Sequence, residues 1–494
     1  MLLFFLAACG GKSQDSTAPP FEFAHPTDMP SLRGSGGPTA SFDSEELWQN
    51  CAYLEGGEND VDHHNLVVPY RGHLLLPWAP EWGRGGLTFF EMNNPCQPEK
   101  VGEGFHERMR ESHAIGLLHL PETDPHSGEY AITAGVLGIQ VWDISTVETP
   151  EMINYLEIEG VFYPDAYTGV VLSVFWQHPW LYVAAADNGI FIVNTENPKE
   201  PELVHQHEFD VPLRAAGVFA IGNHLLVTSA EGSSAEILDI SDPSAPQPIP
   251  GGRFDATDST GTAYEAYHGN LAGPWALFAR KENGGGVMIT DISDPSNPSY
   301  VADVRSEGGN SGYVFYDEGY AFLGDSNWAI VYDLRDLDNI VEVGRGNLEG
   351  DLDTMTPYGN VAILSVDDES VDKQSSAVMP WQSEPDTLGP VPWHFVPGDG
   401  STNVPLGSRI GVSFNEMVEP SSAFAGSVRL YEADGTAVDG WVTAQENTVN
   451  YSPKINLKPN TTYRFEVLES GIKDINMNAV EQTVQIEFTT VGSE

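Results

Sequence analysis

The sequence predicts an all-β protein in which a seven-bladed β-propeller is followed by a β-sandwich. The first indication is a strand-and-turn pattern that recurs from about residue 45 to 385, with four strand signals in each repeat. The second is a new pattern from residue 388 onward, where short alternating strands and turns follow one another. The third is composition, because 50 glycines and 35 prolines in 494 residues favour turns and short strands, and no long amphipathic helical pattern competes.

Charge narrows the classes of partner. The chain has 22 Lys and Arg against 72 Asp and Glu, a formal net charge of −50. Such a surface repels phosphate backbones and anionic lipid headgroups, so nucleic-acid binding is excluded. It suits cationic partners, divalent ions or a salty medium, and composition alone does not choose among these. The hydrophobic share of 40% and charged share of 19% are typical of a globular chain.

The N-terminus predicts an envelope location. An apolar run over 2–8 leads directly into Cys9, and Leu6-Ala7-Ala8-Cys9 resembles a bacterial lipobox. The resemblance implies that residues 1–9 are a lipoprotein signal, that Cys9 is lipidated and that the membrane contact is the lipid anchor. Gly10 in place of Asp favours the outer membrane. A buried N-terminal strand is the alternative. Residues 10–42, rich in Ser, Gly and Pro, predict a flexible tether.

Two further cysteines, Cys51 and Cys96, would lie in an oxidising compartment. One disulfide between them is the economical prediction, and two separate buried thiols are the alternative. The spacing is not that of a zinc site.

The repeat is an apolar strand that ends in an acidic or amide residue and runs into a proline-containing turn. The Asp or Asn side chain can accept hydrogen bonds from the following backbone and proline fixes the backbone angle, so the turn is chemically specified. Copies occur at 89–95, 141–150, 192–198, 237–243, 289–295 and 331–336. First strands are expected to begin about every 48 residues, near His64, His113, Thr168, Ala216, His268, Ser311 and Asp353.

The segments 189–193 (Gly-Ile-Phe-Ile-Val) and 239–243 (Asp-Ile-Ser-Asp-Pro) resemble the LVIVD repeat of bacterial secreted and surface β-propellers. The resemblance assigns residues 43–387 to the propeller. A propeller ring must close, because an open sheet edge invites aggregation. We expect Leu47–Asn50 to pair with the first or last blade and the cysteine pair to pin it.

Residues 388–494 predict a separate β-sandwich. Leu457-Lys458-Pro459-Asn460-Thr461-Thr462-Tyr463 lies between two strand signals and resembles the SbsA-type bacterial Ig-like domain. One departure is at 473–478, where the family usually has Gly before the Asn. The resemblance implies an Ig-like fold that acts as a spacer or adhesive module and carries no catalytic residues.

Superposed repeats place the residues that precede the first strands at one mouth of the central channel. Three imidazoles and a carboxylate among them, His64, His113, His268 and Asp353, could hold a transition metal or act as acid and base. Ordinary side chains at a solvated rim are the alternative. Three neighbours could orient a ligand there: Tyr167, Arg214 and Tyr267.

No P-loop, nucleophile elbow, H-E-x-x-H or EF-hand spacing is present, and no cofactor is expected. Acidic clusters raise Ca²⁺ as an alternative, although none has the repeated frame of a calcium loop and a solvated acidic face explains them better. The clusters are Glu58, Asp60 and Asp62; Asp351 and Asp353; Asp367, Asp368 and Glu369. Trp78, Trp82, Trp176 and Trp328 could form a glycan platform or pack between strands.

Two functions follow from these observations. The preferred one is a non-enzymatic, lipid-anchored binding or adhesion scaffold for a protein or glycan at the cell surface or facing the periplasm, with the propeller as an interaction disc. The alternative is a metal-assisted hydrolase or lyase at the channel mouth. The enzyme requires His113, His268 and Asp353 to approach one point in a concave site.

Overall fold

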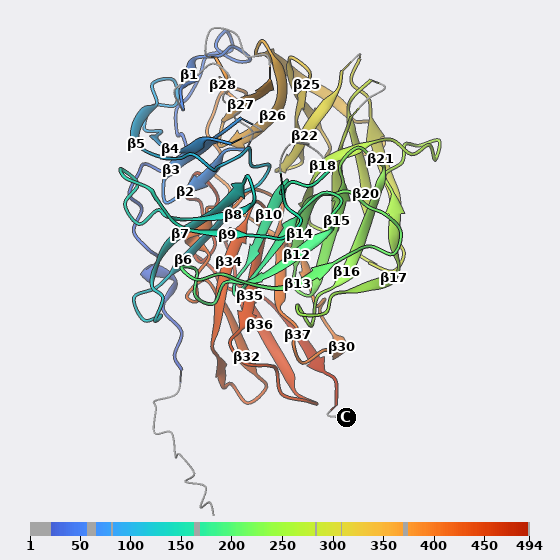
Figure 1. Ribbon diagram of the computed structural model, residues 1–494. Coiled ribbons are helices and arrows are strands. Elements are labelled where there is room, and N and C mark those ends of the chain that lie inside the picture. The colour runs from blue at the N-terminus through green and yellow to red at the C-terminus, as the bar shows by residue number, and fades with distance from the viewer. Residues whose placement is uncertain are drawn as a thin grey trace, which may run out of the picture.

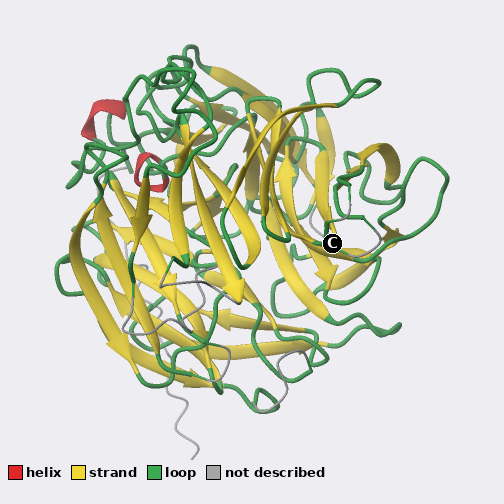
Figure 2. Ribbon diagram, turned by 90° about the horizontal axis from the view of Figure 1, so that it is seen from above, coloured by secondary structure: helices red, strands yellow, loops and turns green. Residues whose placement is uncertain are grey.

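The computed structural model describes residues 21–56, 66–80, 83–162, 168–281, 284–307, 309–368 and 374–492. These residues form β-strands and two single-turn 3₁₀ helices, η1 (Pro26–Asp28) and η2 (Pro420–Ser422), drawn in red in Figure 2. Over the described ranges, none of the helices has the length and apolar character needed to cross a bilayer.

Seven four-stranded antiparallel sheets are the blades of the propeller. Blade 1 is β2 (Val68–Tyr70), β3 (His73–Trp78), β4 (Gly85–Glu91) and β5 (Glu99–His106); blade 2 is β6 (Gly116–Leu120), β7 (Gly128–Gly135), β8 (Gly138–Asp143) and β9 (Glu151–Glu157); blade 3 is β10 (Ser173–Gln177), β11 (Trp180–Ala184), β12 (Ile190–Asn194) and β13 (Glu202–His207). First strands of neighbouring blades contact one another, so each blade's first strand lines the centre.

The next three blades repeat this order. Blade 4 is β14 (Ala215–Ile221), β15 (His224–Ser229), β16 (Ser234–Asp239) and β17 (Gln247–Asp255); blade 5 is β18 (Ala266–Ala272), β19 (Trp275–Arg280), β20 (Val287–Asp291) and β21 (Ser299–Val304); blade 6 is β22 (Ser311–Asp317), β23 (Tyr320–Asp325), β24 (Trp328–Asp333) and β25 (Val341–Asn347). Seven blades confirm the fold class and blade number predicted from the repeat.

The seventh blade joins the two ends of the propeller chain. It consists of β26 (Asp351–Tyr358), β27 (Val361–Asp368), β28 (Ser376–Pro380) and, as its outer strand, β1 (Ala52–Leu54). The predicted pairing with the last blade is therefore confirmed, although the paired strand lies just beyond Leu47–Asn50, where Trp48 N–H still donates to Pro380 O at 2.8 Å. The Cys51–Cys96 disulfide, also predicted, ties this closing segment to the turn after β4.

The proline turns after the third strands show why the repeat is recognisable. Ser241 N–H donates to Asp239 Oδ1 at 2.8 Å and Ser244 N–H to Asp242 Oδ1 at 3.0 Å. Blade 5 has the same bonds from Ser293 to Asp291 and from Ser296 to Asp294, at 2.8 and 3.0 Å. Each carboxylate thus stabilises the turn that follows its own strand.

The C-terminal domain is a sandwich of two sheets around one apolar core. One sheet has the order β29 (Pro392–Val396), β31 (Ile410–Phe414), β35 (Thr448–Pro453) and β34 (Gly440–Gln445). The other has the order β30 (Ser401–Val404), β37 (Val484–Thr490), β36 (Thr462–Val467), β32 (Val428–Glu432) and β33 (Ala437–Val438). Figure 1 shows its orange and red strands stacked directly against the propeller.

The segment 21–50 departs from the predicted tether. Gly37 N–H donates to Ile475 O at 2.7 Å, Asn360 Nδ2 donates to Ala40 O at 2.6 Å, and the Arg429 guanidinium donates to Ala24 O at 2.8 Å. Because these bonds join 21–42 to both domains, this part of the predicted tether is folded onto the body. Residues 1–20, with Cys9, lie outside the described residues.

Candidate functional site

The two ends of the propeller are distinguished by the direction of the first strands. His113 lies before the start of β6, whereas Asp124, beyond its end, accepts a hydrogen bond from Trp441 of the Ig-like domain at 3.2 Å. Blade 6 has the same polarity, since Asp317 at the end of β22 accepts from Met417 N–H at 2.9 Å. The Ig-like domain therefore covers the end opposite the predicted channel mouth.

At the covered end, the hairpin between β34 and β35 reaches the innermost strands of four blades. Gln445 Nε2 donates to Val174 O at 3.1 Å in blade 3, and Asn450 Nδ2 donates to Ala220 O at 2.9 Å in blade 4. Asn270 of blade 5 donates to Glu446 at 2.5 Å, and Asn447 donates to Tyr316 O of blade 6 at 3.0 Å. This arrangement corrects the expectation of a spacer, because the domain is packed onto one end of the propeller and its hairpin contacts the inner strands there.

The opposite end gathers aromatic and ionisable side chains from blades that face each other across the ring. The His113 and His268 ring centroids are 5.8 Å apart. Tyr313 stacks on His268 with centroids 4.2 Å apart and lies 5.9 Å from His113. His113 Nε2 lies 2.9 Å from Glu111 Oε1. His113 precedes blade 2 and His268 lies in blade 5, and the centre is narrow enough for the two imidazoles to approach.

Asp353 belongs to the same end. A Cβ on Gly312, the neighbour of Tyr313, would lie 2.3 Å from Asp353 Oδ1, so only glycine allows this carboxylate to sit there. Burial and the nearby Asp367 carboxylate raise the pKa of Asp353 well above its usual value, while the Lys281 ammonium opposes that shift. Burial, together with His113, lowers the pKa of His268 well below its usual value, so this imidazole is neutral at pH 7.

The other predicted mouth residues do not all join this cluster. Arg214 instead pairs with Asp187 at 2.9 Å and with Glu231. Ala216 is part of an apolar cluster, and Ser311 Oγ donates to Asp325 at 2.9 Å. Outside the described residues lie His64, Tyr167 and the side chain of Tyr267.

The structure also locates several of the tryptophans and acidic residues that the sequence singled out. Trp78 and Trp176 are buried and donate to Thr88 and Thr195 at 3.0 and 2.8 Å, so they pack between strands and do not form a glycan platform. Asp351 and Asp367 act electrostatically on Asp353 at the channel end. Outside the described residues lie Trp82, Glu58, Asp60, Asp62, Glu369 and the side chain of Asp368.

Sequence reasoning missed Glu111, Tyr313 and Lys281. Glu111 precedes His113 by two positions and Tyr313 follows Ser311 by two, so the repeat register could have found both if residues adjoining the predicted starts had been included. Lys281 follows β19 and has no counterpart in the repeat. The resulting site is a buried group of imidazoles, a phenol, carboxylates and an ammonium, which can exchange protons and hydrogen-bond a polar group.

Family comparisons agree with this architecture. Residues 176–207, 215–249 and 281–305 match the LVIVD repeat, and residues 386–490 match the bacterial Ig-like domain. The chain therefore carries LVIVD repeats in an all-β propeller and a C-terminal bacterial Ig-like domain, as the sequence predicted. No curated protein matches the chain.

Solved structures that are similar to this chain have low identity to it and TM-scores below 0.5. The WD40 domain of Pan2 from Neurospora crassa is 11% identical with a TM-score of 0.49, covering 71% of this chain and 98% of that chain. The periplasmic gluconolactonase PpgL of Pseudomonas aeruginosa is 9% identical with a TM-score of 0.49, covering 65% and 95%. BamB from Moraxella catarrhalis is 12% identical with a TM-score of 0.43, covering 67% and 99%. These likenesses concern the fold alone.

Proposed function

We propose that the protein is a lipid-anchored envelope scaffold that binds a protein or glycan partner at the propeller end carrying His113, His268 and Asp353. The observation that carries this proposal is the hairpin of the Ig-like domain, whose buried amides occupy the opposite end of the channel. A partner that approaches the centre of the ring must therefore come from the other side.

The charge of the chain supports a partner with basic groups. At a net charge of −50, long-range attraction accelerates the approach of cationic surfaces and slows that of anionic ones. Asp187 and Glu231, in turns between second and third strands at the proposed end, are about half exposed and hold Arg214 between them. They are the rim that such a partner would meet first.

The binding proposal is tested with the full chain carrying Cys9→Ser, which cannot be lipidated, on glycan and envelope-protein arrays. For any ligand found, the pair Asp187→Arg and Glu231→Arg should weaken binding at least about tenfold, because it reverses two rim charges. The pair Asp242→Arg and Asp294→Arg, an equal charge reversal in exposed turns at the covered end, should leave it unchanged. Equal loss in both variants would refute binding at this end.

Anchoring is a separate part of the proposal and has its own measurement. Mass spectrometry of the mature protein from bacterial membranes should find an N-terminal Cys9 with acyl chains, and Cys9→Ser should release the protein from the membrane fraction. An intact Met1 on membrane-associated protein would refute the anchor.

A metal-assisted hydrolase or lyase remains the second candidate, favoured by the 5.8 Å approach of His113 and His268 and by the Glu111 contact. A carboxylate that orients an imidazole is a common arrangement in proton transfer and metal ligation. We expect turnover of a hydrolase or lyase substrate only if this candidate is correct, with loss in His113→Ala at unchanged folding. No turnover with or without added Zn²⁺ or Mn²⁺ would exclude it.

A further inference from the structure

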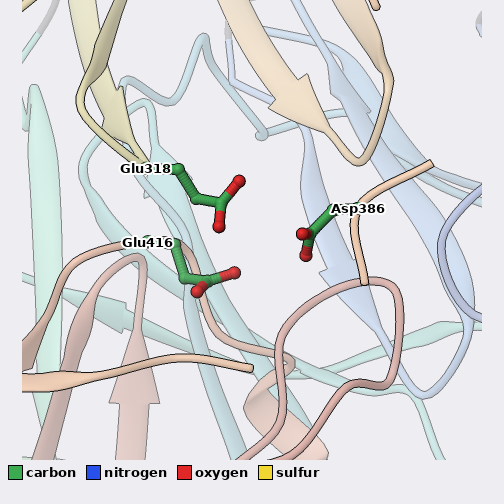
Figure 3. A group of neighbouring side chains, drawn as sticks. All are labelled: Glu318, Asp386 and Glu416. Atoms are coloured by element: carbon green, nitrogen blue, oxygen red, sulfur yellow. The ribbon is translucent and has the colours of Figure 1, made fainter. Parts of the chain in front are cut away.

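A second ionisable cluster lies at the seam between the propeller and the Ig-like domain. Glu318 is in the turn between β22 and β23, Asp386 is in the segment that joins β28 to β29, and Glu416 follows β31. One carboxylate oxygen of each lies within 4.8 Å of those of the other two. Figure 3 shows the three carboxylates turned toward a common space.

This space is a small pocket of about 10 Å³ that Asp317 and Asp474 also line. Among its described lining residues there are five carboxylates and no Lys, Arg or His. The five come from the propeller, the linking segment and the Ig-like domain. Docking of the two domains therefore concentrates negative charge at one point.

Hydrogen bonds account for part of this charge. Asp317 Oδ1 accepts from Met417 N–H at 2.9 Å, and both oxygens of Asp474 accept from Asn478 at 2.7 Å. Asp386 Oδ2 accepts from Asn478 Nδ2 at 3.2 Å.

Glu416 is different. Its residue is only 3% exposed, and its Oε1 has no hydrogen-bond partner among the described residues. A buried carboxylate oxygen without a partner costs several kcal/mol unless a proton or a cation neutralises it, and Glu416 points into the acidic pocket.

Burial and mutual repulsion act on the pocket in the same direction. Burial raises the pKa of Glu318 to about 7, with Asp386 adding to the shift. Burial raises the pKa of Glu416 to about 11, with Asp317 the largest of the neighbouring carboxylates that add to it.

We propose that Glu318, Asp386 and Glu416 bind a Ca²⁺ ion that fastens the Ig-like domain to the propeller. The donors are all oxygen, which selects a hard divalent cation. Ca²⁺ accepts irregular shells of about six to eight oxygens, whereas Mg²⁺ demands a near-ideal octahedron. The three carboxylate oxygens lie within 4.8 Å of one another, so one Ca²⁺ ion can reach all of them, with water or the remaining carboxylates completing the shell.

The site is distinct from the acidic clusters that the sequence singled out, and it does not depend on the proposed function. Its ligands are supplied by three parts of the chain, so an ion bound to all of them holds the domains together. Ca²⁺ should bind weakly enough to respond to extracellular concentrations, near 10⁻⁴ to 10⁻³ M.

Tb³⁺ alone is the first probe, because it replaces Ca²⁺ and Trp381 lines the same pocket and can sensitise its luminescence. Excitation of the full chain at the tryptophan band should produce Tb³⁺ emission that Ca²⁺ displaces. Glu416→Gln, which keeps the shape and removes the charge, should weaken Tb³⁺ binding at least about tenfold. Glu446→Gln, a buried carboxylate at the same interface but outside the pocket, is the matched control and should bind as the wild type does.

Thermal unfolding provides a second readout that does not depend on luminescence. Saturating Ca²⁺ should raise the melting temperature of the wild type and of Glu446→Gln by roughly 5 °C relative to EDTA, and that of Glu416→Gln by far less. Tb³⁺ emission of equal strength in Glu416→Gln, or a wild-type melting temperature that Ca²⁺ does not change, would overturn the proposal. If Glu416→Gln fails to fold, Asp386→Asn replaces it with the same expected loss.

Discussion

The two ends of the propeller are filled by side chains of different chemistry. At the covered end, Asn447 and Asn450 satisfy the backbone of inner strands through amide groups that carry no charge at any pH. At the open end, the buried side chains of His113, Glu111 and Asp353 are themselves ionisable. Amides can close a structure permanently, whereas ionisable groups respond to pH and to bound ligands.

The two ends also differ in how they hold buried charge. At the open end the cluster contains its own cation, because the Lys281 ammonium opposes the rise in the pKa of Asp353. The seam pocket at the covered end is lined by carboxylates and, over its described residues, by no basic side chain. The first cluster therefore contains a cation of its own that partly offsets the carboxylates, and the second, over its described lining residues, contains none.

The largest effect is expected from breaking the amide closure. Asn450 Oδ1 accepts from Gln177 Nε2 at 2.9 Å and from Gly222 N–H at 2.8 Å, and its Nδ2 donates to Ala220 O at 2.9 Å. Asn450→Ala leaves these buried groups unsatisfied and should lower the free energy of unfolding by about 3 kcal/mol, equally at pH 5 and pH 8. Urea denaturation at both pH values measures this.

Asn339→Ala is the control for that experiment, because Asn339 is exposed in a propeller turn and its loss should cost less than about 0.5 kcal/mol. If the loss of unfolding free energy in Asn450→Ala depends strongly on pH, the prediction is contradicted, because the amides that hold the hairpin to the propeller carry no charge.

A smaller effect is expected at the single carboxylate within the closing hairpin. Burial raises the pKa of Glu446 to about 7, although the hydrogen bond from Asn270 opposes the shift. The folded state therefore holds a proton that the unfolded state has released, and stability falls as pH rises from about 4.5 to 7. Glu446→Gln should flatten this fall and stabilise the protein by about 2 kcal/mol at pH 8.

Denaturation curves collected between pH 4.5 and 8 measure the difference between Glu446→Gln and the wild type. If the free energies of unfolding of the two proteins change with pH in parallel, Glu446 ionises as it does in the unfolded chain and is not buried in the contact between the hairpin and the propeller.

Periodicity explains which of these features the sequence predicted. The Asp turns repeat along the chain, so the blades and the expected first-strand starts near His113, His268 and Asp353 followed from the register. The ring closure by an N-terminal segment was expected for another reason, because an open sheet edge invites aggregation. The disulfide followed from the count, since Cys51 and Cys96 remained after Cys9 was assigned to lipidation.

The sequence contains no periodic pattern that predicts the contacts at the covered end. Glu318, Asp386 and Glu416 lie on three segments that meet only after the Ig-like domain docks, and Asn450 sits in a domain whose family pattern describes its own sandwich and not the surface beneath it. The bonds that fix 21–42 to both domains likewise depend on that docking. Composition alone predicted a linker, because Ser, Gly and Pro are also suited to a segment without strands that packs between two domains.

The smallest effect tests whether the open end responds to pH. Burial lowers the pKa of His268 well below its usual value, so the folded state binds fewer protons than the unfolded state, and stability falls as pH drops below about 6.5. His268→Phe keeps an aromatic ring stacked on Tyr313 and removes the imidazole that the unfolded state protonates. It should therefore recover about 1 kcal/mol of the free energy of unfolding at pH 5.5. Tyr313→Phe keeps the imidazole and should retain the wild-type slope. If His268→Phe instead keeps the full acid slope, His268 is not the group that makes this end sensitive to protons, and the contrast with the amide-closed end must rest on Asp353 and Glu111.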